Sequence, residues 1–248
     1  MVLFFHIEYG YSILEDLKKI LDRYMKMAPE VKDYCDRCLS TQRWGGNITL
    51  MVVDACFTSI GLNYFKTVVP KVMEFEKKLV KTGRIVSLEA LSSAKIGELR
   101  KIWRNRRSWE AAKSIARHLT KIRSEWKLKS DREAFIYWAR NAKLQNWGED
   151  SIGKVKGVGI NTFQYLRMMG GVDTVMPDKI VKRVVAKILK ESNVDMPKAD
   201  DLAFIETVHE ISRKTKYRAI EICWMTWLIQ SEAGVSRSEK YSKILPKI

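Results

Sequence analysis

The sequence predicts a mostly α-helical fold, and three of its features support this. Apolar residues recur at intervals of three and four along most of the chain, which places them on one face of a helix. Alternation of polar and apolar residues, which is typical of half-buried strands, is scarce apart from a candidate short strand at residues 2–7. Of the 248 residues, 46% are hydrophobic. A chain of this length and composition can bury a substantial core, as one domain or as two small ones.

The predicted helices follow one another from the N-terminal region onwards. Apolar residues share one helical face at residues 13–24 and again at 65–79. A third amphipathic helix is predicted at 111–122, with lysines and arginines on its opposite face, and a fourth at 135–144. Residues 219–229 are apolar on almost every face, which is typical of a central buried helix.

The chain is strongly basic. It has 45 lysines and arginines against 29 aspartates and glutamates, which gives a formal net charge of +16. Such an excess favours a polyanionic partner, above all nucleic acid. A generally basic protein without such a partner would have the same composition, so the choice between the two depends on motifs.

Other segments bear on where the protein acts. No run approaches the roughly 20 apolar residues that a membrane span needs. Residues 1–6 lack the basic start and the small-residue cleavage site of a secretory signal. The four cysteines are Cys35, Cys38, Cys56 and Cys223. Their spacing is not that of a disulfide framework, so we expect an intracellular protein with no membrane partner and no metal at the Cys35–Cys38 pair.

Two glycines within residues 152–162 indicate a hairpin between two helices. Gly157 and Gly159 flank Val158, and a new helical pattern begins near Thr162. Because glycine has no side chain, the backbone could approach a phosphate closely here, and the following helix would present unpaired N–H groups to it. A tight turn without any ligand would show the same pattern.

The order of segments after this hairpin resembles a known family. A Gly-Gly pair at residues 170–171 is followed by Asp178 at the start of the next helical segment. A helix-hairpin-helix, a Gly/Pro-rich loop and an aspartate follow one another in this way in the base-excision DNA glycosylases related to endonuclease III. The similarity covers roughly residues 47–234, and outside the hairpin and the aspartate loop it concerns helix order.

Two motifs carry the resemblance. The family hairpin reads Leu-Pro-Gly-Val-Gly, and Val155 to Gly159 resembles it, with Lys156 in place of the proline. The family aspartate loop reads Val-Asp-Thr-His-hydrophobic-x-Arg-Val. Asp178 matches its aspartate, and Arg183-Val184 falls where the pattern ends.

The resemblance implies two helical lobes with a DNA-binding cleft between them. Residues 48–172 would form a contiguous lobe that ends in the helix-hairpin-helix, and residues 1–47 with 173–248 would form a second lobe from both chain ends. It also implies a function in base excision repair. The protein would bind duplex DNA with a damaged or mismatched base, flip that base out and hydrolyse its N-glycosidic bond. We expect a monomer.

Asp178 is the predicted catalytic residue. Cleavage of a glycosidic bond builds positive charge on the sugar, and a carboxylate beside it stabilises that charge or activates the attacking water. Asp178 follows Pro177 and precedes a run of apolar helix positions at 180–189, so it is also a candidate N-cap. Both roles can coexist.

Asn161 occupies the position of the lysine that attacks the sugar in bifunctional relatives, and an amide cannot form the Schiff base. The resemblance therefore favours a monofunctional DNA glycosylase. Two alternatives stay open: a bifunctional glycosylase/AP lyase with Lys156 or Lys179 as a displaced nucleophile, and a non-catalytic DNA-binding protein that keeps the hairpin. Both lysines would more ordinarily contact phosphate. The predicted DNA-binding residues are Lys154, Lys156, Gly157, Val158, Gly159, Lys179 and Lys182.

No cofactor is expected, with one exception that the resemblance implies. A monovalent cation would be held by the backbone carbonyls of Gly153, Val155 and Val158 when DNA is bound. The iron–sulfur cluster of many relatives is not expected, because Cys223 is the only cysteine after Asp178.

A flipped base needs an aromatic surface on which to stack. The candidates are Trp44, Phe57, Trp103, Trp138 and Trp227, each of which also fits a core position. Asp54 lies in the otherwise apolar segment 48–57, where it would face the base pocket or pair with a buried donor. Of these two roles, we expect the pairing.

Overall fold

The computed structural model of the chain describes residues 11–195 and 200–248. It is mostly helical, which confirms the predicted fold class. The strand predicted at residues 2–7 lies outside the described residues. Within the described part of the chain, no helix is both long and apolar enough to cross a membrane.

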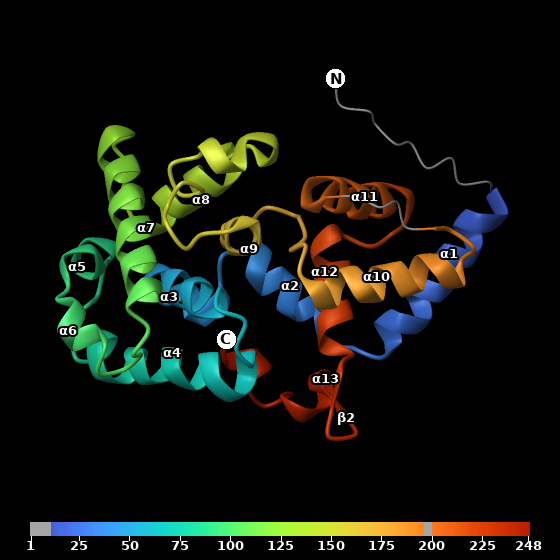
Figure 1. Ribbon diagram of the computed structural model, residues 1–248, viewed down its shortest axis with the longest axis horizontal. Coiled ribbons are helices and arrows are strands. Elements are labelled where there is room, and N and C mark those ends of the chain that lie inside the picture. The colour runs from blue at the N-terminus through green and yellow to red at the C-terminus, as the bar shows by residue number, and fades with distance from the viewer. Residues whose placement is uncertain (1–10, 196–199) are drawn as a thin grey trace.

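One set of helices occupies one side of the molecule (Figure 1). It comprises α3 (Ile48–Thr58), α4 (Val69–Phe75), α5 (Leu88–Ser93), α6 (Ile96–Leu99), α7 (Arg106–Glu125), α8 (Asp131–Asn141) and α9 (Ile160–Met169). Helices α3, α5 and α8 pack against α7. The Asn105 side chain caps α7 by accepting the amide N–H of Ser108. Its apolar face, which includes Ala112 and Leu119, is buried. The helix predicted at 111–122 is therefore confirmed, with an earlier start.

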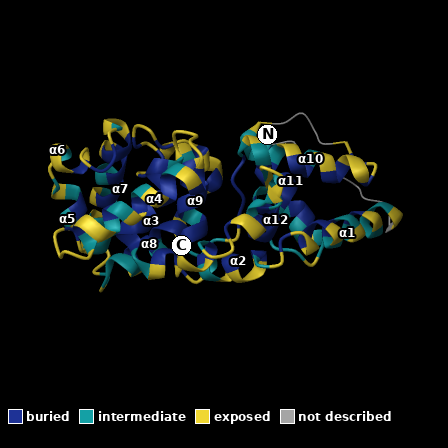
Figure 2. Cartoon of the chain, turned by 90° about the horizontal axis from the view of Figure 1, so that it is seen from below, coloured by how far each residue is buried: buried dark blue, intermediate teal, exposed yellow. Residues whose placement is uncertain are grey.

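The second set lies on the other side (Figure 1). It comprises α1 (Tyr11–Lys26), α10 (Lys179–Glu191), α11 (Asp201–Lys214) and α12 (Ala219–Leu228). Helix α12 contacts the other three and is buried along nearly its whole length, as the sequence predicts (Figure 2). Helix α2 (Val31–Leu39) joins the two sets, because it contacts both α12 and α9.

The segment 65–79 is not the single regular helix that the sequence predicts. Two π-helical turns, Tyr64–Val68 and Glu76–Val80, flank α4. Pro70, at the start of α4, has no amide hydrogen to donate to the preceding turn, which accounts for the first irregularity. Apolar spacing does not reveal this change, because the buried side chains still share one face.

Other predicted boundaries shift by a few residues. Helix α8 ends at Asn141, and a 3-10 turn, Leu144–Glu149, follows it. Helix α9 begins at Ile160 rather than near Thr162, because Gly159 already occupies its N-cap position. Two further 3-10 turns are Arg43–Gly46 and Leu245–Lys247.

A short β-hairpin that the sequence did not predict follows α12. Strands β1 (Ser231–Glu232) and β2 (Val235–Ser236) pair antiparallel, and α13 (Arg237–Lys240) begins directly after β2. Ala233 and Gly234 form the tight turn with positive φ angles of 58° and 84°. Two-residue strands are too short for alternation to show in a sequence.

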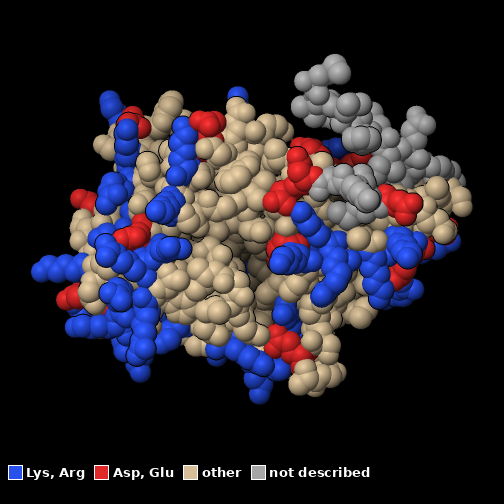
Figure 3. Space-filling view, viewed as in Figure 1, with Lys and Arg blue, Asp and Glu red and all other residues tan. Residues whose placement is uncertain are grey.

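One continuous cluster of buried hydrophobic side chains runs through both sets of helices. The predicted division of the chain into 48–172 and the remainder stays a prediction, and so does the two-lobe interpretation. Figure 3 shows lysines and arginines gathered over α5 to α7 on one side and over α10 on the other, with a hollow in mostly uncharged surface between them.

Candidate functional site

A cavity of about 690 Å³ opens where α3, α9, α12 and the start of α10 meet. Its lining therefore combines residues from both sets of helices. Five predicted site residues belong to it: Gly157, Gly159, Asn161, Asp178 and the aromatic candidate Trp227. A larger groove of about 840 Å³ lies between α1 and α10 and contains none of the predicted site residues. The smaller cavity is therefore the candidate site.

The chain before α9 forms one helical turn and then one tight turn. The amide N–H of Lys154 donates to the carbonyl of Asp150 at 2.9 Å, which closes the helical turn. The amide N–H of Val158 donates to the carbonyl of Val155 at 2.9 Å, which closes the tight turn. The Asp150 carboxylate also accepts the amide N–H of Ile152 at 2.8 Å. The predicted hairpin segment is thus a compact pair of turns that leads into α9.

Three glycines of this segment differ in what the fold requires of them. A Cβ atom at Gly153 would lie 1.7 Å from the Trp147 carbonyl oxygen, so only glycine fits. Gly157 has a φ of +97°, which other residues rarely adopt. Gly159 has an ordinary φ of −104°, and a Cβ atom there would meet nothing within 4 Å. The fold explains the first two glycines, whereas Gly159 leaves open space in the cavity wall.

Asp178 is partly buried at the N-terminus of α10 and lines the cavity. Its Oδ1 atom accepts the amide N–H of Val181 at 2.8 Å, so the candidate N-cap is confirmed. Burial raises the pKa of Asp178, although this hydrogen bond and the charge of Arg237 oppose the shift. A carboxyl group with a raised pKa in a cavity is a common feature of functional sites.

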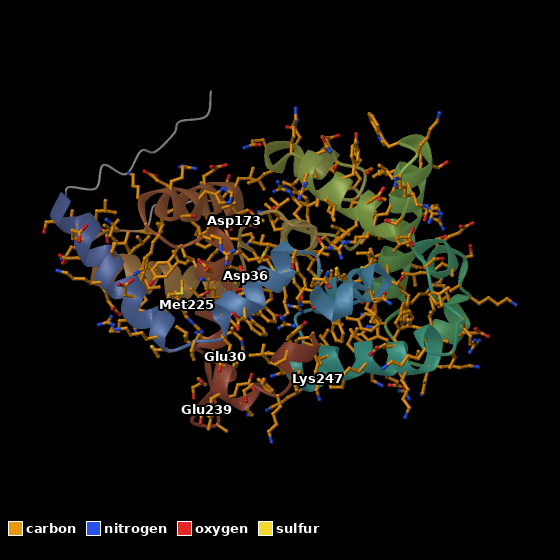
Figure 4. All side chains as sticks on the ribbon, turned by 180° about the vertical axis from the view of Figure 1, so that it is seen from behind. Glu30, Asp36, Asp173, Met225, Glu239 and Lys247 are labelled. Carbon is orange, nitrogen blue, oxygen red and sulfur yellow. The ribbon has the colours of Figure 1, made fainter. Side chains whose placement is uncertain are left out.

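The other aspartate of the same loop, Asp173, has a structural contact instead. Its Oδ1 atom accepts the amide N–H of Ile220 at 2.9 Å, at the start of α12 (Figure 4). Asp173 is not part of the cavity lining. Of the two aspartates in this loop, Asp178 is the one that faces the candidate site.

Aromatic rings from α9, α12 and the turn before α4 form a wall of the cavity. The four rings are those of Tyr64, Tyr165, Trp224 and Trp227, with neighbouring centroids 5.6–6.0 Å apart. Trp227 was among the predicted aromatic candidates, but the other three and Trp147, which also lines the cavity, were not. Tertiary packing brings these rings together, and no local sequence pattern announces it.

Arg237, the first residue of α13, also lines the cavity and was not predicted. Its Nε donates to Oε1 of Glu232 at 2.8 Å, and its guanidinium carbon lies over the Trp227 ring, 4.2 Å from the centroid. The short β-hairpin turns the chain back so that Arg237 lies near enough to influence the pKa of Asp178. Nothing in the spacing of the two residues indicates this.

Asp54 lies outside the cavity lining, in a buried polar cluster behind the aromatic wall. Its Oδ2 atom accepts hydrogen bonds from Trp44 Nε1 at 2.8 Å, Tyr64 Oη at 3.0 Å, Tyr165 Oη at 2.7 Å and Arg43 Nη2 at 3.4 Å. Asp54 thus pairs with buried donors, which is the arrangement that its apolar segment favours. It reaches the cavity only indirectly, through the two tyrosines.

The structure does not place the other predicted base-pocket residues in the cavity either. Trp44 donates to Asp54, as described. Phe57 is fully buried and stacks on Trp103 with a centroid distance of 4.4 Å. Trp138 donates from Nε1 to the Asp150 carboxylate at 3.0 Å and so supports the turns before α9. Aromatic character alone could not separate these core positions from the cavity wall.

The predicted DNA-binding lysines lie at or near the surface but differ in their partners. Lys154 and Lys182 each form an ion pair with a carboxylate, Glu149 and Asp201 respectively. Lys156, in the turns before α9, and Lys179, the first residue of α10, are exposed. Neither forms an ion pair with a described residue. No lysine is among the described residues that line the cavity.

The carbonyls predicted to hold a cation, those of Gly153, Val155 and Val158, lie in the two turns before α9. The Val155 carbonyl accepts the amide N–H of Val158 and retains a second lone pair. The other two accept no backbone hydrogen bond from the described residues, so the three oxygens are chemically suited to a hard cation. Within the same residues, no group of three His, Cys, Asp or Glu side chains could hold a metal. All four cysteines are buried and unpaired.

Comparison with known proteins adds a family. No curated protein and no solved structure matches the chain. A family model described as "Domain of unknown function (DUF8548)" matches residues 25–231. This span includes the hairpin, Asp178 and α12, and it ends before Arg237. The chain therefore belongs to the DUF8548 family.

Proposed function

We propose that the protein is a DNA glycosylase of base excision repair, which acts as a monomer inside the cell. It would hydrolyse the N-glycosidic bond of a damaged or mismatched base flipped out of duplex DNA. The observation that carries this proposal is that Asp178, Asn161, Gly157 and Gly159 line one cavity with an aromatic wall. Gly157, Gly159 and Asp178 match the glycosylase motifs, and Asn161 stands at the position of the lysine of the bifunctional relatives. The volume of about 690 Å³ lies within the usual range of small-molecule sites.

Asp178 is the proposed catalytic residue. When the glycosidic bond breaks, the base leaves with the bonding electrons and the sugar gains positive charge. The ionised carboxylate of Asp178 would stabilise this charge, while a water molecule adds its oxygen to C1′ and the proton that it loses neutralises the departing base. Because the Val181 amide already holds Oδ1, the carboxylate needs little reorganisation for this role.

The turns before α9 are the proposed contact with the DNA backbone. The fold does not require glycine at position 159, but the close approach of a phosphate would require it. The N-terminus of α9 would offer unpaired amide groups to the same phosphate. Lys156 and Lys179, both exposed, would add salt-sensitive contacts. A monovalent cation on the hairpin carbonyls would add positive charge beside the phosphate.

The duplex would lie across the hollow between the two sets of helices (Figure 3). Lysines and arginines gather on both sides of this hollow, where the two strands of a duplex could pass. The cavity with its aromatic wall is lined by residues of both sets. We therefore propose that the two sets act as the lobes of a DNA-binding cleft.

We further propose that the reaction is monofunctional. Asn161 stands where bifunctional relatives have lysine, and no described residue of the cavity lining supplies an amine. Water would then be the nucleophile, and the abasic strand would stay intact. The bifunctional alternative requires Lys156 or Lys179 to reach the sugar. The non-catalytic alternative requires that Asp178 serve only as the cap of α10.

The decisive experiment compares wild type with Asp178→Asn on a panel of duplexes, each with one lesion or mismatch. Asparagine is an equally good N-cap but carries no negative charge. We expect the variant to bind DNA normally and to excise its base at least about 100-fold more slowly. Equal excision rates would remove Asp178 from the mechanism, and no excision from any duplex by wild type would favour the non-catalytic alternative.

The products of the same reactions test the choice of nucleophile. Strand breaks should appear only after hot alkali, and borohydride should trap no covalent complex. A trapped complex that disappears in Lys156→Ala or Lys179→Ala would establish the bifunctional alternative and identify the lysine.

A further inference from the structure

Arg237 is fixed in the cavity wall by contacts on one edge and one face of its guanidinium group. Its Nε donates to Oε1 of Glu232 at 2.8 Å, and Oε2 of Glu232 accepts the Tyr241 hydroxyl at 2.7 Å. The guanidinium carbon lies 4.2 Å from the centroid of the Trp227 ring, within the range of a cation–π contact. These contacts orient the group before any ligand is bound.

The other edge of this guanidinium group has no partner in the described part of the protein. Neither Nη1 nor Nη2 donates a hydrogen bond there, and Nη1 is buried. The Arg237 side chain is only 14% exposed, so water satisfies little of it. The indole N–H of Trp224, in the same lining, is likewise buried and unpartnered. Buried donors without acceptors are costly, and where they line a cavity they are available to a ligand.

Hydroxyl groups of the same cavity are already engaged elsewhere. Tyr64 and Tyr165 donate to the Asp54 carboxylate at 3.0 and 2.7 Å. The Thr58 hydroxyl donates to the Asp54 carbonyl at 2.8 Å. Besides Asp178 and Asn161, a ligand that enters the cavity meets aromatic faces and the unpaired donors of Arg237, and the part of the ligand beside Arg237 must present acceptors.

We propose that Arg237 reads the flipped base and selects bases that carry a carbonyl oxygen where the parent base carries an amino group. Deamination makes this exchange when it converts adenine to hypoxanthine and cytosine to uracil. An arginine donates to such a carbonyl, whereas it meets an amino group as donor against donor. A site built to hydrogen-bond one group rejects the analogue without it far better than an apolar pocket does.

The proposed substrate class is therefore deaminated bases, and this rests on the glycosylase function proposed above. Arg237 lies beyond the span 25–231 that the family model matches. The selectivity would thus depend on the β-hairpin and α13, while Asp178 and the hairpin before α9 belong to the matched span.

The experiment measures binding to duplexes whose test nucleotide has a 2′-fluorinated sugar, because this resists glycosidic cleavage. One pair of duplexes carries hypoxanthine or adenine, and a second pair carries uracil or cytosine. Each test base stands opposite an abasic analogue, so no base pair has to be broken. We expect wild type to bind the carbonyl member of each pair at least about tenfold more tightly, at the lower end of what a bidentate arginine contact gives.

Two variants and one control test whether the preference for the carbonyl base depends on the donors of Arg237. Arg237→Met keeps an apolar stem on Trp227 and removes the donors, so it should bind both members of each pair alike. Arg237→Lys keeps the charge without the planar fork, so it should retain most of the overall affinity and lose most of the preference. Arg107→Met, which removes an exposed arginine on α7, should lower affinity for all four duplexes and leave the preference intact.

Equal binding of both members by wild type would overturn the inference, and so would a preference that survives in Arg237→Met and Arg237→Lys. Failure of the glycosylase proposal has a different signature. Excision that depends on Asp178 without a preference that depends on Arg237 would refute only the selectivity. A preference that depends on Arg237 without any excision would refute only the catalysis.

Discussion

Asp54 and Asp178 are carboxylates whose pKa is raised by burial, yet their surroundings differ. Asp54 is fully buried, and its Oδ2 atom alone accepts four side-chain hydrogen bonds. Asp178 is only partly buried, is held by backbone amides at the start of α10 and faces the cavity. The protein itself supplies the hydrogen-bond donors to Asp54, whereas the carboxylate of Asp178 is accessible to a ligand in the cavity.

The same contrast holds for the arginines of the two regions. Burial alone would lower the pKa of Arg43, but Tyr165, Tyr64 and Asp54 raise it, so the guanidinium stays charged within the buried cluster. Among the described residues, both arginines keep a buried donor without an acceptor, Nε of Arg43 and Nη1 of Arg237, but only Arg237 lines the cavity. A donor in the cavity wall is available to a ligand, whereas a donor in the core is not.

The largest effect is expected from breaking the internal cluster. Arg43→Met would leave Asp54 buried without its counter-charge, and loss of one partner from a buried ion pair typically costs about 3–5 kcal/mol. We expect a decrease of this size in the free energy of unfolding, measured by urea denaturation with an unchanged m-value.

A double variant tests whether the cost arises from the uncompensated charge. Arg43→Met with Asp54→Asn removes both charges, so it should lose less stability than the sum of the two single variants. A decrease below about 1 kcal/mol in Arg43→Met would contradict the view that this cluster serves the fold.

Substitutions of the two glycines that line the cavity should have smaller effects, at Gly157 on stability and at Gly159 on DNA binding. Gly157→Ala forces a side chain onto a positive φ and should cost about 1–2 kcal/mol of unfolding free energy. Gly159→Ala meets no atom within 4 Å and should leave stability unchanged, yet weaken duplex binding by about tenfold, as expected for a lost phosphate contact. Normal DNA binding by Gly159→Ala would show that no ligand approaches the backbone there.

Much of the fold follows from local sequence patterns. The spacing of apolar residues predicts α1 and α7, and the apolar run at 219–229 predicts α12, because both patterns depend only on nearby residues. The π-helical turn before α4 escapes this reasoning, since Pro70 changes the hydrogen bonding without moving the apolar face. The strands β1 and β2 escape it because they are too short to alternate.

The sequence predicts the site residues that belong to short motifs, and it does not predict those that only tertiary packing brings to the cavity. Gly157, Gly159 and Asp178 belong to compact motifs, so the sequence points to them directly. Trp224 and Arg237 reach the same cavity from later segments, and only packing brings them there. The aromatic candidates Trp44, Phe57 and Trp138 have the right chemistry, but the fold uses them in the core.

The smallest effect is expected from the charge of Asp178 itself. Because burial raises the pKa of this carboxyl, the folded chain binds its proton more tightly than the unfolded chain does. The free energy of unfolding therefore falls as pH rises from the unfolded pKa to the folded pKa, and it stays lower above that window. Asp178→Asn keeps a cap on α10 and does not titrate. At pH 7 it should be as stable as wild type or more stable, by less than about 1 kcal/mol.

This advantage should shrink as the pH is lowered through the same window, because wild type regains the stability it lost when Asp178 takes up its proton. Thermal unfolding of both proteins at several pH values between neutral and acidic would measure the trend. Asp54→Asn is the matched comparison, since it removes an acceptor on which four side-chain donors depend and should destabilise the protein at neutral pH. If Asp178→Asn were equally destabilised there, Asp178 would be a structural aspartate like Asp54. The charge of Asp178 beside the cavity would then no longer support a catalytic role for this residue.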